Sequence, residues 1–117
     1  MIKNEKEFDE VKVEAGEGVS IKVLISSKMA PNFAMRKFRI KKGGFMPYHT
    51  NSVEHEQYVV SGRAKVMIDG KEFTAKKDDV LFIPAGVAHS YKVLGDEDYE
   101  FLCSVPNQED RIEIVDR

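Results

Sequence analysis

Apolar residues recur at every second position in several short runs of this chain. The pattern is clearest in residues 19–25, 34–40, 64–68 and 99–105. A period of two places successive side chains on opposite faces, as in half-buried antiparallel strands. No segment carries an amphipathic helical stripe, and only residues 4–10 are compatible with a single short helical turn. The sequence therefore predicts an all-β fold.

Glycine-containing turn signals separate these runs. Asp69-Gly70 lies between two apolar runs and is the signal of a two-residue hairpin with a type I′ turn. Residues 8–13 and 111–115 have the composition of terminal strands. Many short strands in a chain of 117 residues, with no change of composition, predict one domain over residues 1–117 with a sandwich or barrel architecture. Further turns are expected at residues 16–18, 43–44, 61–62, 85–86 and 95–96.

The composition excludes several classes of protein. Hydrophobic residues make up 42% of the chain and charged residues 32%, which argues against disorder. The net charge of −2 argues against a nucleic-acid partner or an anionic membrane. No apolar run is long enough to span a membrane, and the N-terminal residues form no secretory signal. The single cysteine, Cys103, excludes an intrachain disulfide, and we expect a cytoplasmic location.

The three histidines, His49, His55 and His89, all lie beside turn signals. His55 and His89 begin apolar runs, and His49 follows a Gly-Gly pair and Pro47, so each is expected near the start of a strand. Strand starts can converge at one end of a closed sheet, and three imidazoles suit a divalent transition metal. Alternatively, each histidine is a rim residue that bonds to a backbone carbonyl.

Two segments around these histidines resemble the sequence motifs of the cupins. Residues 43–62, GGFMPYHTNSVEHEQYVVSG, resemble the first motif, and residues 78–93, DDVLFIPAGVAHSYKV, resemble the second. The resemblance implies a single-domain cupin, which is a jelly-roll barrel or double-stranded β-helix, similar to the small cupins of thermophilic microbes. The residues that fit the two motifs are Gly43, His49, Gly62, Pro84, Gly86 and His89.

The sequence also departs from the motifs. Asn51 stands where a second histidine is usual, and His55 stands where glutamate is usual. The resemblance implies one divalent metal per chain, with Mn or Fe favoured over Ni, Cu or Zn. It implies ligands at His49, Asn51, His55 and His89. Either the Asn51 oxygen is a direct ligand, or Asn51 turns away and water takes its place. No carboxylate belongs to this expected set, although Glu54, which flanks His55, is an alternative ligand.

Strand alternation suggests further residues that face the interior: Arg36, Gln57, Tyr91 and Cys103. Arg36 is expected to hold a substrate carboxylate or orient dioxygen, or alternatively to form a structural ion pair. Gln57 and Tyr91 are expected to orient substrate, although Tyr91 also fits a purely structural place in the core. Cys103 is either a small buried hydrophobe or, near a redox metal, an oxidisable thiol.

The function expected from the resemblance is that of a dioxygenase-like or related oxidoreductase. Its partner would be a small chelating substrate, for which an anion is a suitable class. Two alternatives are a non-catalytic ligand-binding or sensor cupin, and a metal-dependent isomerase or decarboxylase that stabilises an enolate. The resemblance also implies a homodimer joined through N-terminal strands.

Overall fold

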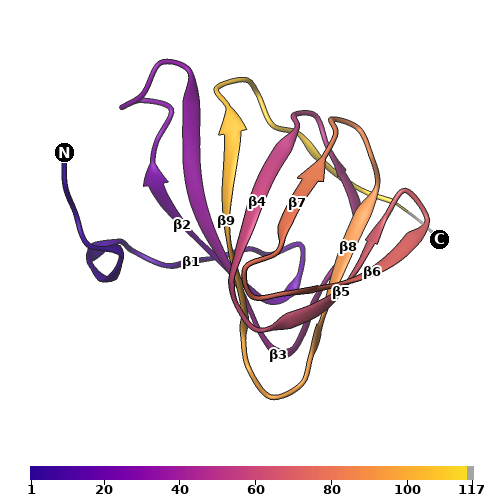
Figure 1. Ribbon diagram of the computed structural model, residues 1–117. Helices are drawn as coiled ribbons and strands as arrows, with labels where there is room; N and C mark the ends of the chain where they lie inside the picture. The colour runs from indigo at the N-terminus through magenta and orange to yellow at the C-terminus, as the bar shows by residue number, and fades with distance from the viewer. Residues whose placement is uncertain (116–117) are drawn as a thin grey trace.

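A computed structural model describes residues 1–115. After a short 3-10 helix, η1 (Glu5–Glu7), these residues form ten strands of one sheet, which curls into an open barrel (Figure 1). No helix in this part of the chain is long and apolar enough to cross a membrane. The strands are β1 (Val11–Lys12), β2 (Glu17–Ile25), β3 (Phe33–Asn51), β4 (His55–Ser61), β5 (Arg63–Ile68), β6 (Lys71–Lys76), β7 (Val80–Ile83), β8 (His89–Leu94), β9 (Tyr99–Pro106) and β10 (Ile112–Ile114).

The sheet is organised around β3. The strand order is β6-β5-β8-β3-β9-β4-β7, and β2 and β10 also pair with β3. All of these pairings are antiparallel. Because non-consecutive strands are neighbours, residues far apart in the sequence meet on the inner face. The all-β jelly-roll prediction is confirmed.

The turn predicted at residues 43–44 is wrong, because β3 continues through both glycines. Gly43 has φ +78°, which bends the strand without reversing it. The first part of β3, residues 33–40, pairs with β9, whereas residues 45–49 pair with β8. His49 therefore lies near the end of a 19-residue strand, and the prediction that it begins a strand is also wrong.

The hairpin predicted at Asp69-Gly70 is confirmed. The two residues have φ values of 52° and 79° and connect β5 to β6, with Ile68 paired to Lys71. Positive φ at both central residues is the property of a type I′ turn. Strands are also present where terminal ones were predicted, but β1 and β10 are short, with 2 and 3 residues.

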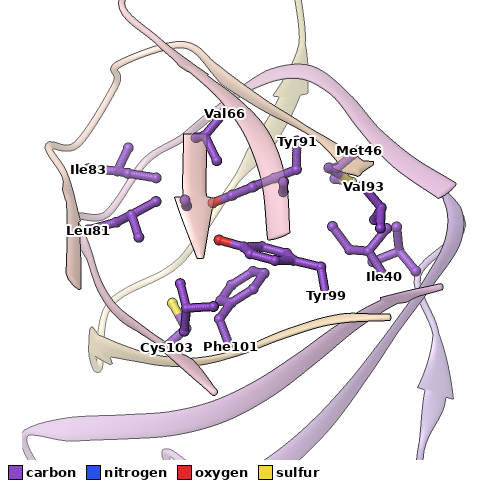
Figure 2. Close-up of a cluster of buried hydrophobic side chains, with 14 of the residues drawn as sticks. Ile40, Met46, Val66, Leu81, Ile83, Tyr91, Val93, Tyr99, Phe101 and Cys103 are labelled. Carbon is purple, nitrogen blue, oxygen red and sulfur yellow. The ribbon is translucent and has the colours of Figure 1, made fainter. Parts of the chain in front are cut away.

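Aromatic side chains from neighbouring strands fill the barrel interior. Phe101 in β9 stacks on Tyr91 of β8 and on Phe38 of β3, with ring centroids 5.3 and 5.2 Å apart. Tyr99 packs beside both Tyr91 and Phe101 (Figure 2). Such contacts between rings add to the stabilisation from burial of their apolar surface. This core lies next to the histidines, because Tyr91 also contacts the His89 ring.

Tyr99 is buried completely, but its hydroxyl group has no hydrogen-bond partner. Burial raises the pKa of this hydroxyl well above its usual value, so the group stays neutral. A buried hydroxyl that has lost its water without gaining a partner destabilises the folded state by about 1 kcal/mol or more. We therefore expect Tyr99→Phe to raise the free energy of unfolding by about 1 kcal/mol, as measured by urea denaturation. A loss of stability would show that the hydroxyl group is bonded.

Candidate functional site

The sequence-predicted site residues gather around one cavity in the barrel. The cavity has a volume of about 50 Å³, which is room for about four water molecules. Apart from the predicted site residues, the wall of the cavity is mostly apolar and includes Ile40, Met46 and Phe101. Cys103 is the one predicted site residue outside the lining, and it lies directly behind His55. The lining contains Arg36, His49, Asn51, His55, Gln57, His89 and Tyr91.

Strand pairing brings the histidines together. His49 in β3 and His89 in β8 are direct partners across the two strands, and their ring centroids lie 4.1 Å apart. The β3–β8 register shifts between Met46 and His49, at Pro47, which has no N–H group to donate to the sheet. His55, the first residue of β4, places its ring centroid 6.3 Å from that of His89.

Backbone carbonyls fix the tautomers of His49 and His89. Nδ1 of His49 lies 2.8 Å from the Pro47 oxygen, and Nδ1 of His89 lies 3.0 Å from the Val87 oxygen. A carbonyl oxygen only accepts, so each Nδ1 donates its hydrogen and each Nε2 keeps a free lone pair. Burial lowers the pKa of His49. Burial is also the largest effect on His89, and together with the charge of His49 it lowers the pKa of His89 to about 3. Both rings are therefore neutral potential ligands.

His55 has a different environment. Its Nδ1 lies 3.3 Å from the Cys103 sulfur, and its Nε2 lies 3.4 Å from Oδ2 of Asp110. Burial favours the neutral ring, but Asp110 and Cys103 outweigh burial and raise the pKa of His55 to about 9. Burial acts to raise the pKa of Asp110, and the facing His55 and Arg36 overcome that effect and lower it. In the absence of metal, His55 and Asp110 therefore form an ion pair.

Asp110 is the residue that the sequence analysis missed. It lies in the segment between β9 and β10, where β10 pairs with the stretch of β3 that carries His49 and Asn51. Its Oδ1 accepts a hydrogen bond of 3.3 Å from Nδ2 of Asn51. The only available signal was its place directly before a predicted terminal strand, and the partner of that strand was unknown.

Arg36 reaches the same carboxylate. One guanidinium nitrogen lies 3.7 Å from Oδ2 of Asp110, and another is 3.7 Å from the Cys103 sulfur. The guanidinium also lies over the Phe38 ring, 5.3 Å from its centroid. Its Nε is buried without a hydrogen-bond partner. Arg36 thus has a structural ion pair and still retains an unused donor.

Gln57 and Tyr91 form a hydrogen-bonded pair on the cavity wall. Nε2 of Gln57 donates to the Tyr91 oxygen over 2.8 Å, the Tyr91 hydroxyl donates to Oε1 of Gln57 over 3.2 Å, and both side chains are buried. Burial raises the pKa of Tyr91 well above its usual value, although the hydrogen bond with Gln57 acts in the opposite direction. The Tyr91 hydroxyl is therefore a neutral donor, held in place by Gln57, next to the His89 ring at 5.7 Å between centroids.

The donor set fits a divalent metal ion. Within residues 1–115, no three His, Cys, Asp or Glu side chains are already grouped as a metal cluster. However, Nε2 of His55 and Oδ1 of Asn51 are buried atoms with no hydrogen-bond partner. Buried polar atoms without a hydrogen bond are rare in folded proteins, and of these two only Nε2 of His55 has a charged group beside it, the Asp110 carboxylate. An ion that prefers nitrogen and oxygen ligands matches these atoms and the two neutral histidines.

The fold and the motif residues together define a jelly-roll protein with histidines inside its barrel. Residues 36–105 match the family model described as Cupin domain. The chain therefore belongs to the cupin family, and the resemblance seen in the two motifs is confirmed.

Known proteins of similar sequence or structure include cyclases and decarboxylases. The polyketide synthase CurC of Streptomyces cyaneus is 41% identical over 51 residues, which cover 44% of this chain and 32% of that protein. This chain thus matches only about a third of that relative's length. The polyketide cyclase RemF of Streptomyces resistomycificus has a TM-score of 0.89 at 22% identity, over 100% of this chain and 87% of that one. A predicted oxalate decarboxylase of Thermotoga maritima has a TM-score of 0.80 at 22% identity, over 91% and 98%.

Proposed function

We propose that the cavity binds one divalent metal ion through His49, His55 and His89, with Asn51 as a further ligand. The proposed activity is non-redox chemistry on a small substrate whose carbonyl group can form an enolate. The observation that carries the metal site is the meeting of two neutral imidazoles with two buried donor atoms that lack any hydrogen bond.

The volume of the cavity limits which part of a substrate can enter it and react. A volume of about 50 Å³ admits a reactive carbonyl group but not a whole polycyclic molecule. The rest of a larger substrate therefore lies along the apolar part of the lining, to which Val13 and the exposed Ile112 belong. Compounds with alternating carbonyl groups suit this arrangement, since they combine apolar surface with acidic C–H bonds. The likeness to a polyketide cyclase and to part of a polyketide synthase supports the same substrate class.

Each polar residue has a role in such a reaction. When bound, a divalent metal supplies Lewis-acid stabilisation of the negative charge that develops on a substrate oxygen. The Tyr91 hydroxyl, which donates to Oε1 of Gln57 over 3.2 Å, can turn this hydrogen to a second substrate oxygen while Nε2 of Gln57 still holds the Tyr91 oxygen in place. The Arg36 guanidinium adds positive charge to the wall of the cavity. The apolar wall excludes water and strengthens these interactions.

The proposal is tested on untagged protein that is purified without added metal. Elemental analysis should find close to one divalent ion per chain, or the protein should take up Mn²⁺ or Zn²⁺ stoichiometrically. The loaded protein should then accelerate deuterium exchange at the central carbon of a 1,3-diketone, followed by NMR in D₂O. Chelator-treated protein is the control and should lose this acceleration. A protein that neither retains nor takes up any metal would overturn the proposal.

An oxygen electrode separates this chemistry from the dioxygenase-like activity expected from the sequence. The enolate proposal predicts exchange without oxygen uptake, whereas an oxygenase consumes oxygen together with the substrate. Tight binding of the diketone with neither reaction would instead indicate a sensor. The homodimer and the cytoplasmic location stay predictions.

A further inference from the structure

We propose that Asp110 is a ligand of the metal, supplied by the segment between β9 and β10. This inference rests on the proposed metal site and extends it. It places a carboxylate in the coordination shell from outside both cupin motifs. Asp110 was not among the ligands expected from the sequence. Among residues 1–115, Asp110 is the acidic residue that contacts His55, Asn51 and Arg36.

The distance between Asp110 and His55 suits coordination of one ion by both side chains. Oδ2 of Asp110 lies 3.4 Å from Nε2 of His55, yet Nε2 has no hydrogen-bond partner. The two atoms are thus close without being aligned for a hydrogen bond. Two ligand atoms that each lie about 2.1 Å from one ion at a tetrahedral angle are separated by roughly 3.4 Å. The pair therefore has the spacing of two ligands of a common ion.

The second oxygen of Asp110 orients Asn51. Nδ2 of Asn51 donates to Oδ1 of Asp110 over 3.3 Å, which identifies the amide nitrogen as the end that faces the carboxylate. The amide oxygen is then left buried and without a partner. One carboxylate thus faces the open nitrogen of His55 and directs Asn51 so that its oxygen remains free to bind the ion.

The negative charge of Asp110 would balance part of the positive charge of the ion. Three neutral imidazoles and an amide leave the full 2+ charge on the ion, and the Arg36 guanidinium adds a positive charge nearby. Uncompensated charge in a cavity of low dielectric constant is strongly unfavourable. The Asp110 side chain is 17% exposed, so its negative charge acts with little screening by water. A carboxylate at this position offsets half of the ionic charge.

The backbone holds Asp110 in this place from both sides. The Ser52 hydroxyl donates to the Glu109 carbonyl over 2.7 Å, and the Ser52 N–H donates to the Arg111 carbonyl over 3.0 Å. Ser52 also accepts a 2.6 Å hydrogen bond from the Arg111 N–H. β10 then pairs with β3, opposite Asn51 at Ile112. The carboxylate is therefore positioned before any ion arrives, as a ligand should be.

The experiment compares metal affinities of Asp110→Asn and a matched control, Glu109→Gln. Glu109 is the adjacent acidic residue, and its side chain is 77% exposed. Affinities for Zn²⁺ and Mn²⁺ are measured by competition with a chromophoric chelator. We expect Asp110→Asn to weaken both by at least about 100-fold, since residues that only support a ligand contribute about 10- to 100-fold, and Glu109→Gln to leave them unchanged. The Co²⁺-loaded form gives a second signal, because loss of the carboxylate should alter its visible absorption spectrum.

The possible outcomes separate this inference from the metal site itself. If the unaltered protein binds no metal, the proposed function fails. If it binds metal and Asp110→Asn binds equally well, Asp110 is only an ion-pair partner of Arg36 and the inference is overturned. Should Asp110→Asn fail to fold, a crystal structure of the unaltered Zn²⁺-loaded protein decides. A carboxylate oxygen at about 2.0–2.2 Å from the ion supports the inference, and a distance beyond about 3 Å refutes it.

Discussion

Replacement of His89 with alanine is expected to weaken metal binding by at least about 100-fold, since even residues that only support a ligand contribute about 10- to 100-fold. His89 is 1% exposed and is held by one hydrogen bond to a backbone carbonyl. Its removal therefore deletes a neutral imidazole from the site without breaking an ion pair. The measurement is chelator competition with Zn²⁺, together with elemental analysis of the purified variant.

Loss of a buried side chain also destabilises the fold, so the test needs a control with a similar structural effect. Val93→Ala is suitable, because Val93 is a buried residue of the same strand, β8, and does not line the cavity. It should lower the free energy of unfolding by about 2 kcal/mol while metal affinity stays unchanged. If the two variants bound metal equally well, His89 would not be a ligand.

The largest effect on stability is expected for Gly62→Ala. Gly62 connects β4 to β5 with φ +78°, a conformation that costs an L-residue about 1–2 kcal/mol. In addition, a Cβ atom at this position would overlap the carbonyl oxygen of Asp98 and approach Cα of Tyr99 within 2.9 Å. Backbone atoms cannot move aside as a flexible side chain can. We expect a total loss of about 4 kcal/mol in the free energy of unfolding, measured by urea denaturation.

Gly70→Ala is the matched control for this variant. Gly70 has nearly the same backbone conformation, with φ +79°, but a Cβ there would have no neighbour within 4 Å. The variant should therefore lose only the conformational part, about 1–2 kcal/mol. The difference between the two variants measures the steric contact at Gly62. Equal losses would show that the chain near Asp98 adapts without penalty.

The sequence was sufficient for the fold because its signals were local. Alternation in residues 19–25 and 99–105 matches β2 and β9, and the Asp69-Gly70 pair fixes the β5–β6 hairpin. His55 and His89 begin strands as predicted. The Gly43-Gly44 pair was misread, because a glycine with positive φ can bend a strand as well as end it. Only the pairing of β3 with both β8 and β9 distinguishes these two cases.

The site was predictable where motif residues or strand alternation indicated it. His49, Asn51, His55 and His89 come from the two motifs, and the structure brings them to one cavity. Asp110 has no such signal, since it is one acidic residue in a polar stretch, 59 positions from Asn51 in the sequence. Its contact with the site depends on the pairing of β10 with β3. Pairing between distant strands is a property of the whole fold, which local periodicity does not determine.

The bent strand β3 links the site to the completeness of the barrel. It carries Arg36 before the bend and His49 and Asn51 after it, and its partners come from both halves of the chain. Its pairing with β8 brings His89 to His49, so an unfolded chain keeps these two proposed ligands apart and has less affinity for an ion. An ion that binds only the closed barrel, at a free concentration of 100 times its dissociation constant, stabilises the folded state by about 2.7 kcal/mol. The supply of metal would then affect the stability of the folded protein as well as its proposed activity.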